Sequence, residues 1–252
     1  MTTTIYKNDA KLLMGISLQD DTQLEQNNMA LHVCENPENI IKNREALAAT
    51  IGHSLQDFVC ANQTHSATYY KVTAEDKGRG TLRAEDAIPE TDALYTFEPN
   101  IVLSSFTADC VPVLFYATDS TLVGAIHSGW QGTVKEISLK TFTHLREAEN
   151  VDLQNVHVHI GTALSQEKFE VDADVYTKFK ALGYADDFMY FKDATKKYHI
   201  DNQLTVKKQC ELAGIPAANI TIEDVCTFKS AQGFSYRQDK KAGRHLSFIV
   251  RK

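Results

Sequence analysis

The spacing of apolar residues predicts several helices along the chain. Between residues 36 and 52, apolar side chains recur every three or four positions, which is the spacing of one helix face. Asn36 followed by Pro37 is a typical helix start, and Gly52 is a typical helix end. The same spacing predicts further helices over residues 133–148, 172–182 and 201–213.

Other segments are continuous apolar runs or alternate between apolar and polar residues, as strands do. They cover residues 57–60, 67–73, 101–106, 111–116, 122–127, 155–161, 219–225 and 245–250. A polar loop is expected over residues 76–91. Helices and strands are mixed along the chain, and no repeat, low-complexity tract or linker interrupts them. The pattern therefore predicts one domain of mixed α and β structure, spanning residues 1–252.

Composition narrows the class of protein and its partners. The chain has 252 residues, of which 43% are hydrophobic and 23% charged, which is typical of a globular protein. A net charge of −7 without basic clusters argues against a nucleic-acid partner. Because no apolar stretch is long enough for a membrane span or a signal peptide, we expect no membrane partner and a cytoplasmic location. The five cysteines are widely spaced and are expected to be thiols.

Three residues that can bind a metal ion lie at the ends of predicted strands. His65 and Cys110 follow apolar segments, and His127 is the last residue of its strand. Rigid elements direct side chains at such positions into loop-lined clefts. Two imidazoles and one thiolate suit Zn²⁺, and three protein ligands leave a fourth position for water or substrate. A structural role is the alternative, because the three residues match no short zinc motif.

Neighbouring features each have a chemical and a structural interpretation. Asp109, next to Cys110, is a candidate general base, although a turn carboxylate that accepts backbone N–H groups has the same context. Residues 128–133 (SGWQGT) precede a predicted helix, and their N–H groups favour an anion such as phosphate. Trp130, the only tryptophan, could stack on a flat ligand or pack in the core.

His157 and His159 form an HxH pair on a predicted strand. Residues two apart in a strand face the same side, so this pair is a candidate copper site. A polar face on an otherwise buried strand produces the same pattern, and we favour that interpretation.

Six segments, in this order, resemble those of one known family. They are LHVCENPENIIKNREAL, NQTH, TADCVPVLF, AIHSGWQGT, HIGTALSQEKFEV and CTFKSAQGFSYRQDKKAGR. The combination of QxH, TADC and HxGWxG is specific, and the resemblance spans residues 28 to 249. The chain is similar to the laccase-domain family, long called multicopper polyphenol oxidases and more recently purine nucleoside phosphorylases.

The resemblance implies an α+β fold, with mixed β-sheets flanked by helices, remotely similar to cysteine-dependent toxin deamidases. It implies that His65, Cys110 and His127 are metal ligands. This ligand set favours zinc, and copper could also bind it in vitro, so the choice of native metal stays open. It also implies phosphorolysis of purine nucleosides (adenosine, inosine and methylthioadenosine), with adenosine deamination as a secondary activity. The expected partners are therefore small-molecule purine nucleosides and phosphate.

Candidate substrate-binding residues follow from this chemistry. Phosphate requires cationic or N–H donors, and Arg44, Arg237 and Arg244 are the candidates, with Trp130 for the nucleoside. Cys110, Asp109 and His127 are the candidate catalytic residues. Gln131 stands where many members of the family have arginine. The sequence therefore leaves open which positive charge would lie beside the phosphate.

Other functions fit the sequence less well. A copper-dependent polyphenol oxidase needs several HxH pairs, and this chain has one such pair among nine histidines. A thiol hydrolase would use Cys110 as nucleophile and His127 as base, without a metal. A binding protein without catalytic activity ranks last. The chain lacks the H-x-E and P-C-x-x-C signature, so any deamination must use a different arrangement.

Overall fold

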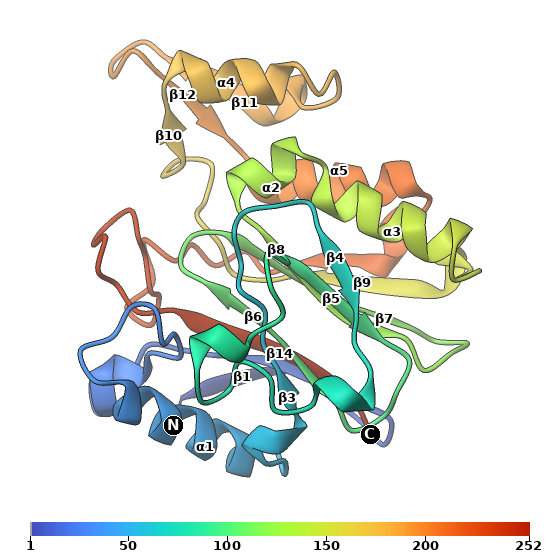
Figure 1. The fold of residues 1–252 in the computed structure, drawn as a ribbon. Coiled ribbons are helices and arrows are strands. Elements are labelled where there is room, and N and C mark those ends of the chain that lie inside the picture. Colours follow the sequence, from blue (N-terminus) through green and yellow to red (C-terminus); the bar gives the residue numbers. More distant parts are fainter. Residues whose placement is uncertain (1) are drawn as a thin grey trace.

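Two large β-sheets lie face to face in the computed structural model, which describes residues 2–252 (Figure 1). The first sheet has the order β1-β2-β14-β6-β3, with the bounds Thr3–Asn8, Leu12–Ser17, His245–Arg251, Val102–Thr107 and Phe58–Val59. The second has the order β13-β9-β7-β8-β5-β4, with the bounds Ile220–Ile222, Val156–Ile160, Val111–Ala117, Val123–Ser128, Ala93–Thr96 and Tyr69–Lys71. Both sheets mix parallel and antiparallel pairs, and the expected α+β fold is confirmed.

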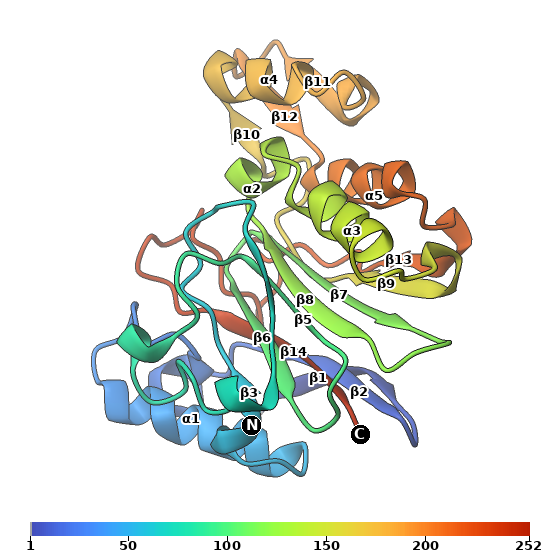
Figure 2. The same ribbon diagram turned by 45° about the vertical axis from the view of Figure 1, so that its right-hand side comes forward.

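Helices cover the outer face of each sheet (Figure 2). Helix α1 (Pro37–Thr50) packs on the first sheet, while α3 (Ile137–Glu147) and α5 (Asn202–Ala213) pack on the second. The start of α1 is as predicted, because the side chain of Asn36 accepts a hydrogen bond from the N–H of Glu38. The molecule therefore has four main layers, with the two sheets inside.

Strand β7 explains why the central strands are continuous apolar runs. Val113 and Phe115 pack toward α3 and α5, whereas Leu114 faces the first sheet. All three side chains are almost fully buried, and burial of each contributes about 1.5–3 kcal/mol. A strand with helices on one side and a sheet on the other has no solvent face, so its sequence shows no polar alternation.

The helix predicted over residues 133–148 is in fact two helices. Helix α2 (Trp130–Val134) ends before Glu136, whose backbone is left-handed with φ of 63°, and α3 begins at Ile137. The apolar spacing continues across this break, and the pattern alone therefore indicated one helix. The segment expected to be an anion-binding turn is largely the short helix α2.

The apolar pattern also misses several strands. Strand β2 is buried along its whole length and shows no alternation, while β1 beside it is largely exposed at the edge of the sheet. The short strand β5 follows the loop of residues 76–91 and was not separated from it. Elements this short or this uniformly buried carry little periodic signal.

A small third sheet stands above one end of the second sheet (Figures 1 and 2). We call it, with its helix, the cap: β10-β12-β11 (Glu170–Val171, Lys197–Ile200 and Met189–Lys192) and α4 (Ala173–Lys180). An apolar cluster of its own holds the cap together and includes Trp130 and Val134 of α2. The cap therefore rests on the helix that follows β8.

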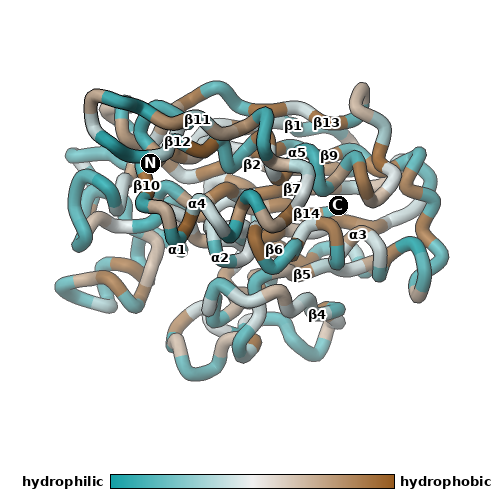
Figure 3. The backbone as a smooth tube through the Cα atoms, turned by 90° about the horizontal axis from the view of Figure 1, so that it is seen from above, coloured by the Kyte–Doolittle hydropathy of each residue, from teal (hydrophilic) through white to brown (hydrophobic). Residues whose placement is uncertain are grey.

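Apolar residues concentrate on the central strands, and hydrophilic residues on the surrounding loops, when the molecule is seen from above (Figure 3). Within residues 2–252, no helix combines the length and the apolarity that crossing a membrane requires.

Candidate metal centre

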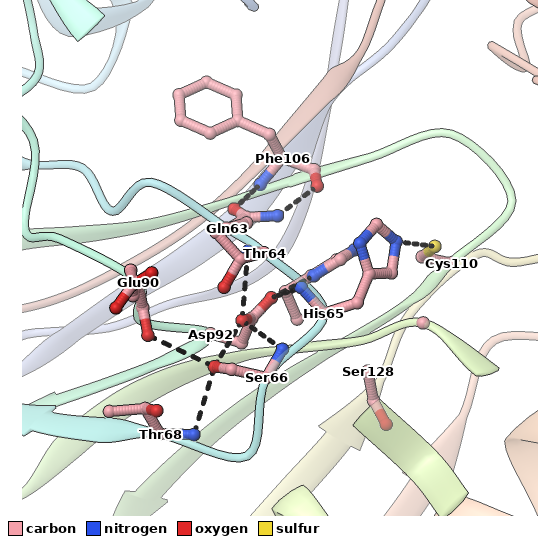
Figure 4. Close-up of polar contacts among 12 residues, drawn as sticks. Gln63, Thr64, His65, Ser66, Thr68, Glu90, Asp92, Phe106, Cys110 and Ser128 are labelled. Carbon is pink, nitrogen blue, oxygen red and sulfur yellow. Dashed lines mark hydrogen bonds and ion pairs between the residues drawn. The ribbon is translucent and has the colours of Figure 1, made fainter. Parts of the chain in front are cut away.

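The connections between the two sheets bring the three predicted metal ligands together. His65 lies on the connection from β3 to β4, and Cys110 lies where the chain passes from β6 to β7. His127 is near the end of β8. The ligand atoms of the three residues all lie within 4.8 Å of one another, and Sγ of Cys110 is 3.8 Å from Nε2 of His65 (Figure 4).

A buried carboxylate, Asp92, orients both histidines (Figure 4). It accepts a hydrogen bond of 2.7 Å from Nδ1 of His127, which directs Nε2 of that ring toward Cys110. It also accepts hydrogen bonds from the backbone N–H groups of Thr64, His65 and Ser66 and from the hydroxyl of Ser66. Burial would raise the pKa of Asp92, but these partners, His127 first, hold that pKa at about 2.

The backbone of His65 has a left-handed conformation, with φ of 56°. This conformation costs energy for a residue other than glycine, and it persists where surrounding contacts fix it. Here the N–H of His65 donates to Asp92, and its carbonyl accepts from Nζ of Lys135 at 2.6 Å. The side chain of Gln63 holds the same connection by two hydrogen bonds of 2.8 Å with the backbone of Phe106.

Asp92 and Gln63 were not among the predicted site residues. Asp92 directly precedes the buried strand β5, and an acidic residue next to a buried strand was the available signal. Gln63 lies two residues before His65 in the QxH motif, but an amide that pairs with a distant backbone segment leaves no local pattern.

The charges of Cys110 and His127 support each other. Burial would raise the pKa of Cys110, but the imidazoles of His127 and His65 lower it to about 6. Burial would lower the pKa of His127, but the Cys110 thiolate and the Asp92 carboxylate raise it to about 9. Both shifts favour the pair in which Cys110 is a thiolate and His127 an imidazolium.

The arrangement fits a zinc ion. A tetrahedral zinc ion with Zn–S of about 2.3 Å and Zn–N of about 2.0 Å separates its sulfur and nitrogen ligands by about 3.5 Å, close to the observed 3.8 Å. Gly129 leaves room beside the ligands, because an added Cβ there would lie 2.5 Å from the His65 ring and 2.9 Å from Sγ of Cys110. The backbone of Gly129 has an ordinary φ of −65°, so close approach, not backbone conformation, requires glycine here.

A cavity of about 760 Å³ opens over the three ligands. Its walls come from the connections between the sheets, from α2, from the cap and from the loop before β14. The cap and its flanking residues contribute three apolar side chains, Phe169, Val171 and Val175, and three carboxylates, Glu170, Asp172 and Asp174. The loop contributes Tyr236, Arg237 and Arg244. Its size and mixed lining are typical of a small-molecule site.

Trp130, Arg237 and Arg244 line this cavity, as expected for substrate-binding residues. Trp130 is half-buried, and Nζ of Lys178 lies 5.1 Å from the centre of its ring. Nη1 of Arg237 donates to the carbonyls of Lys168 and Glu170, so this arginine also ties the loop to the cap. Nη1 of Arg244 donates to the carbonyls of Ala242 and Gly243, next in the chain.

Arg44 does not line the cavity, contrary to its expected role with phosphate. Arg44 lies on α1, and its side chain is buried. It donates hydrogen bonds to the carbonyls of Met29, Gly80 and Thr81. The guanidinium also lies 4.9 Å from the centre of the Phe106 ring. Arg44 therefore fixes the polar loop of residues 76–91 to the body of the protein.

Asp109 lines the cavity, but both of its carboxylate oxygens accept hydrogen bonds of 2.6 Å. The donors are the hydroxyl of Thr227 and the backbone N–H of Arg237. The backbone of Asp109 is left-handed, with φ of 79°. These contacts are those of a carboxylate that stabilises a turn.

His157 and His159 are not part of the centre. The ring of His157 stacks on Tyr116, and that of His159 packs against Tyr6 at an interplanar angle of 40°. Nδ1 of His159 lies 3.0 Å from the hydroxyl of Thr221, and burial lowers the pKa of this histidine to about 4. In the part of the chain that the structure describes, only the centre gathers three potential ligands of the His, Cys, Asp or Glu type.

Two stacked mixed sheets, with a His–Cys–His group where the chain crosses between them, define a protein of the laccase-domain class. The sequence profile described as "Multi-copper polyphenol oxidoreductase laccase" matches residues 14–252. The chain belongs to this family.

Characterised and solved relatives agree with this assignment. "Purine nucleoside phosphorylase YlmD" of Bacillus subtilis (strain 168) is 32% identical over 249 residues, which are 96% of this chain and 90% of that protein. "Purine nucleoside phosphorylase SSP1584" of Staphylococcus saprophyticus is 36% identical over 224 residues, 88% of this chain and 84% of that protein. The crystal structure of YlmD from Geobacillus stearothermophilus has a TM-score of 0.91 at 29% identity, covering 96% of this chain and 93% of that one.

Proposed function

We propose that the protein is a zinc-dependent purine nucleoside phosphorylase, acting on adenosine, inosine and methylthioadenosine, with adenosine deamination as a secondary activity. The observation that carries this proposal is the His65, Cys110 and His127 group at the base of a cavity large enough for a nucleoside. The names of the relatives support the substrate class. A cytoplasmic location suits a site that depends on a reduced thiol.

In phosphorolysis, an oxygen of inorganic phosphate forms a bond to C1′ of the ribose as the C1′–N9 bond breaks. The products are ribose 1-phosphate and the free base, which takes up a proton. Zinc, when bound, supplies a Lewis acid that stabilises negative charge on an oxygen of the reactants. Arg244 and Arg237 attract phosphate, and Trp130 offers a flat surface to the purine.

Deamination would use the same cavity for a different bond change. The oxygen of water would bond to C6 of adenosine, the C6–N6 bond would break, and ammonia would leave. Both reactions need a group that moves a proton, and Asp109 is the proposed general base. Each of its oxygens accepts one hydrogen bond, from Thr227 and from the N–H of Arg237, and keeps a second lone pair for a proton.

The test is phosphate-dependent release of free base from adenosine and inosine, followed by chromatography. Wild-type protein should release base only when phosphate is present, and Cys110→Ala should release none. Cys34→Ala is the matched control, because that thiol is also partly exposed but lies outside the cavity. Activity retained by Cys110→Ala would refute the proposal, and inosine formed from adenosine without phosphate would make deamination the main activity.

A second candidate is a thiol hydrolase with Cys110 as nucleophile. The observation in its favour is the chain of contacts from Cys110 to His127 to Asp92, the order found in catalytic triads. Such an enzyme needs no metal, so activity that persists in a chelator would favour it.

The copper-dependent polyphenol oxidase has less support. Its mechanism needs several copper ions, and residues 2–252 offer a single group of three ligands. The oxidase would become the better candidate if copper-loaded protein oxidised a phenol faster than free copper does.

A further inference from the structure

A carboxylate and a buried histidine form a pair in the wall of the cavity, apart from the metal ligands. Glu170 on β10 lies opposite His199 on β12 in the strand register. The side chain of His199 is 2% exposed and that of Glu170 is 35% exposed, on a residue that lines the cavity. Nε2 of His199 is 3.5 Å from Oε2 of Glu170.

The ring of His199 is held in one orientation. Its Nδ1 lies 3.2 Å from the carbonyl of Gln166, a contact that requires the proton to be on Nδ1. The ring of Tyr190 stacks on it with an interplanar angle of 4° and a centroid distance of 4.9 Å. Nε2 of His199 therefore faces Glu170 across 3.5 Å and has no hydrogen-bond partner within residues 2–252.

The carboxylate of Glu170 still has capacity to accept hydrogen bonds. Within residues 2–252, no backbone or side-chain donor forms a hydrogen bond with it, and His199 is its one ion-pair partner. By contrast, Asp172 in the same wall is paired with Lys197, and each oxygen of Asp109 already accepts one hydrogen bond. Asp174 also lines the cavity and has no partner in the described part of the chain, but it is exposed to solvent, whereas Glu170 is half-buried. A carboxylate of this kind accepts neutral hydroxyl or amide donors and repels phosphate.

We propose that Glu170, oriented by His199, binds the ribose of the nucleoside by accepting hydrogen bonds from its 2′- and 3′-hydroxyls. This assignment rests on the proposed function. The hydroxyl pair is the donor that adenosine and inosine share, whereas their bases differ at N1 and C6. Phe169 and Val171 on either side of Glu170 line the cavity with apolar surface suited to the faces of the sugar. His199 is then a positioning residue, and Glu170 is the group that touches the substrate.

The experiment compares kcat/KM for inosine and for 2′,3′-dideoxyinosine in wild-type protein and in Glu170→Gln. Loss of a hydrogen bond to a charged group should reduce kcat/KM for inosine roughly 10- to 100-fold, and that for the dideoxy analogue less than about threefold. His199→Gln should have a smaller effect in the same direction. Glu167→Gln is the matched control, because this nearby exposed carboxylate pairs with Lys168 and Lys229 and does not line the cavity.

Zinc content and thermal midpoint of each variant, equal to those of wild type, show that fold and metal centre are intact. Equal losses for inosine and the dideoxy analogue in Glu170→Gln would overturn the ribose assignment while leaving the proposed function standing. A loss of kcat/KM with adenosine but not with inosine would depend on the base, and it would overturn the ribose assignment as well. Zinc-loaded wild-type protein without turnover of any nucleoside would overturn the proposed function, and this assignment with it.

Discussion

Two pairs of histidines lie on or beside the second sheet. Only one pair is placed to bind a metal ion together with a further residue. His65 lies on a connection between the sheets and His127 near the end of β8, and both converge on Cys110 with their ring centres 4.8 Å apart. His157 and His159 lie on one strand, two residues apart, and each packs against a tyrosine ring. Two residues on the same face of one strand point their side chains in parallel. Residues from different segments of the chain can point theirs at a common centre.

The second difference is what each ring nitrogen contacts. At the centre, Asp92 accepts from Nδ1 of His127 and leaves Nε2 directed at Cys110. On β9, Nδ1 of His159 contacts Thr221 and its Nε2 is buried without a hydrogen-bond partner. A metal site therefore needs converging nitrogens and also a carboxylate or carbonyl that fixes the far side of the ring.

The sharpest way to break the comparison is to remove one ligand from each pair. His127→Ala should weaken zinc binding roughly 100- to 1000-fold, since about 10–16 kcal/mol of binding is shared among about four ligands. It should also abolish turnover. His157→Ala should change neither zinc binding nor turnover. Competition with a zinc chelator measures the zinc binding of both variants. Equal weakening in the two variants would mean that β9 contributes to the metal site.

Gly129→Ala tests whether the space beside the ligands is needed. The added methyl group would lie within 3.0 Å of the His65 ring and of Cys110, so we expect zinc binding to fall at least about tenfold. Because φ is ordinary at this position, the thermal midpoint without zinc should change little. Gly132→Ala is the control, with its nearest contact at 3.3 Å. Normal zinc affinity in Gly129→Ala would show that zinc binds elsewhere in the protein.

Asp92→Asn tests the orientation of the histidines. The amide can accept fewer of the hydrogen bonds from residues 64–66 and from His127, so zinc affinity should fall about 10- to 100-fold. Competition with a zinc chelator measures this affinity, and an unchanged affinity would remove Asp92 from the account.

A third kind of histidine, His245, predicts a dependence of stability on pH. Both of its nitrogens are bonded, to the carbonyl of Ser17 and to the N–H of Phe234, and burial lowers its pKa to about 4. The unfolded chain binds this proton near pH 6.5, so the contribution to stability is full above that pH and is lost as pH falls toward 4. Between pH 7 and pH 5 the loss should be on the order of 1–2 kcal/mol.

Urea unfolding at pH 7 and pH 5 measures this loss. His245→Gln should have a smaller difference between the two pH values than wild type, since glutamine takes up no proton. The same difference in both proteins would place the titration elsewhere.

Local patterns predicted much of the fold. Helix α1 follows from its cap and its spacing, and the central strands β6 to β9 follow from their apolar runs. The resemblance supplied the grouping of His65, Cys110 and His127, which spacing alone left open. The break between α2 and α3 and the strands of the cap were missed, because left-handed backbone at one residue and very short strands leave no periodic signal.

Site residues that act through distant contacts were harder to predict. Arg44 was expected at the phosphate and instead fixes a loop, because an arginine in a sequence gives no sign of which carbonyls it will reach. Asp92 was missed because its five donors lie at residues 64 to 66 and at His127, which only the stacked sheets bring together. Asp109 lines the cavity, and its role as a base stays a prediction.

The most direct test of the account is to restore zinc to metal-free protein and follow phosphate-dependent release of hypoxanthine from inosine. The account predicts no turnover without metal and a linear rise that stops at one zinc ion per chain. It also predicts no recovery in Cys110→Ala. Full activity in the metal-free protein would contradict the account and would turn Cys110 from a metal ligand into a nucleophile.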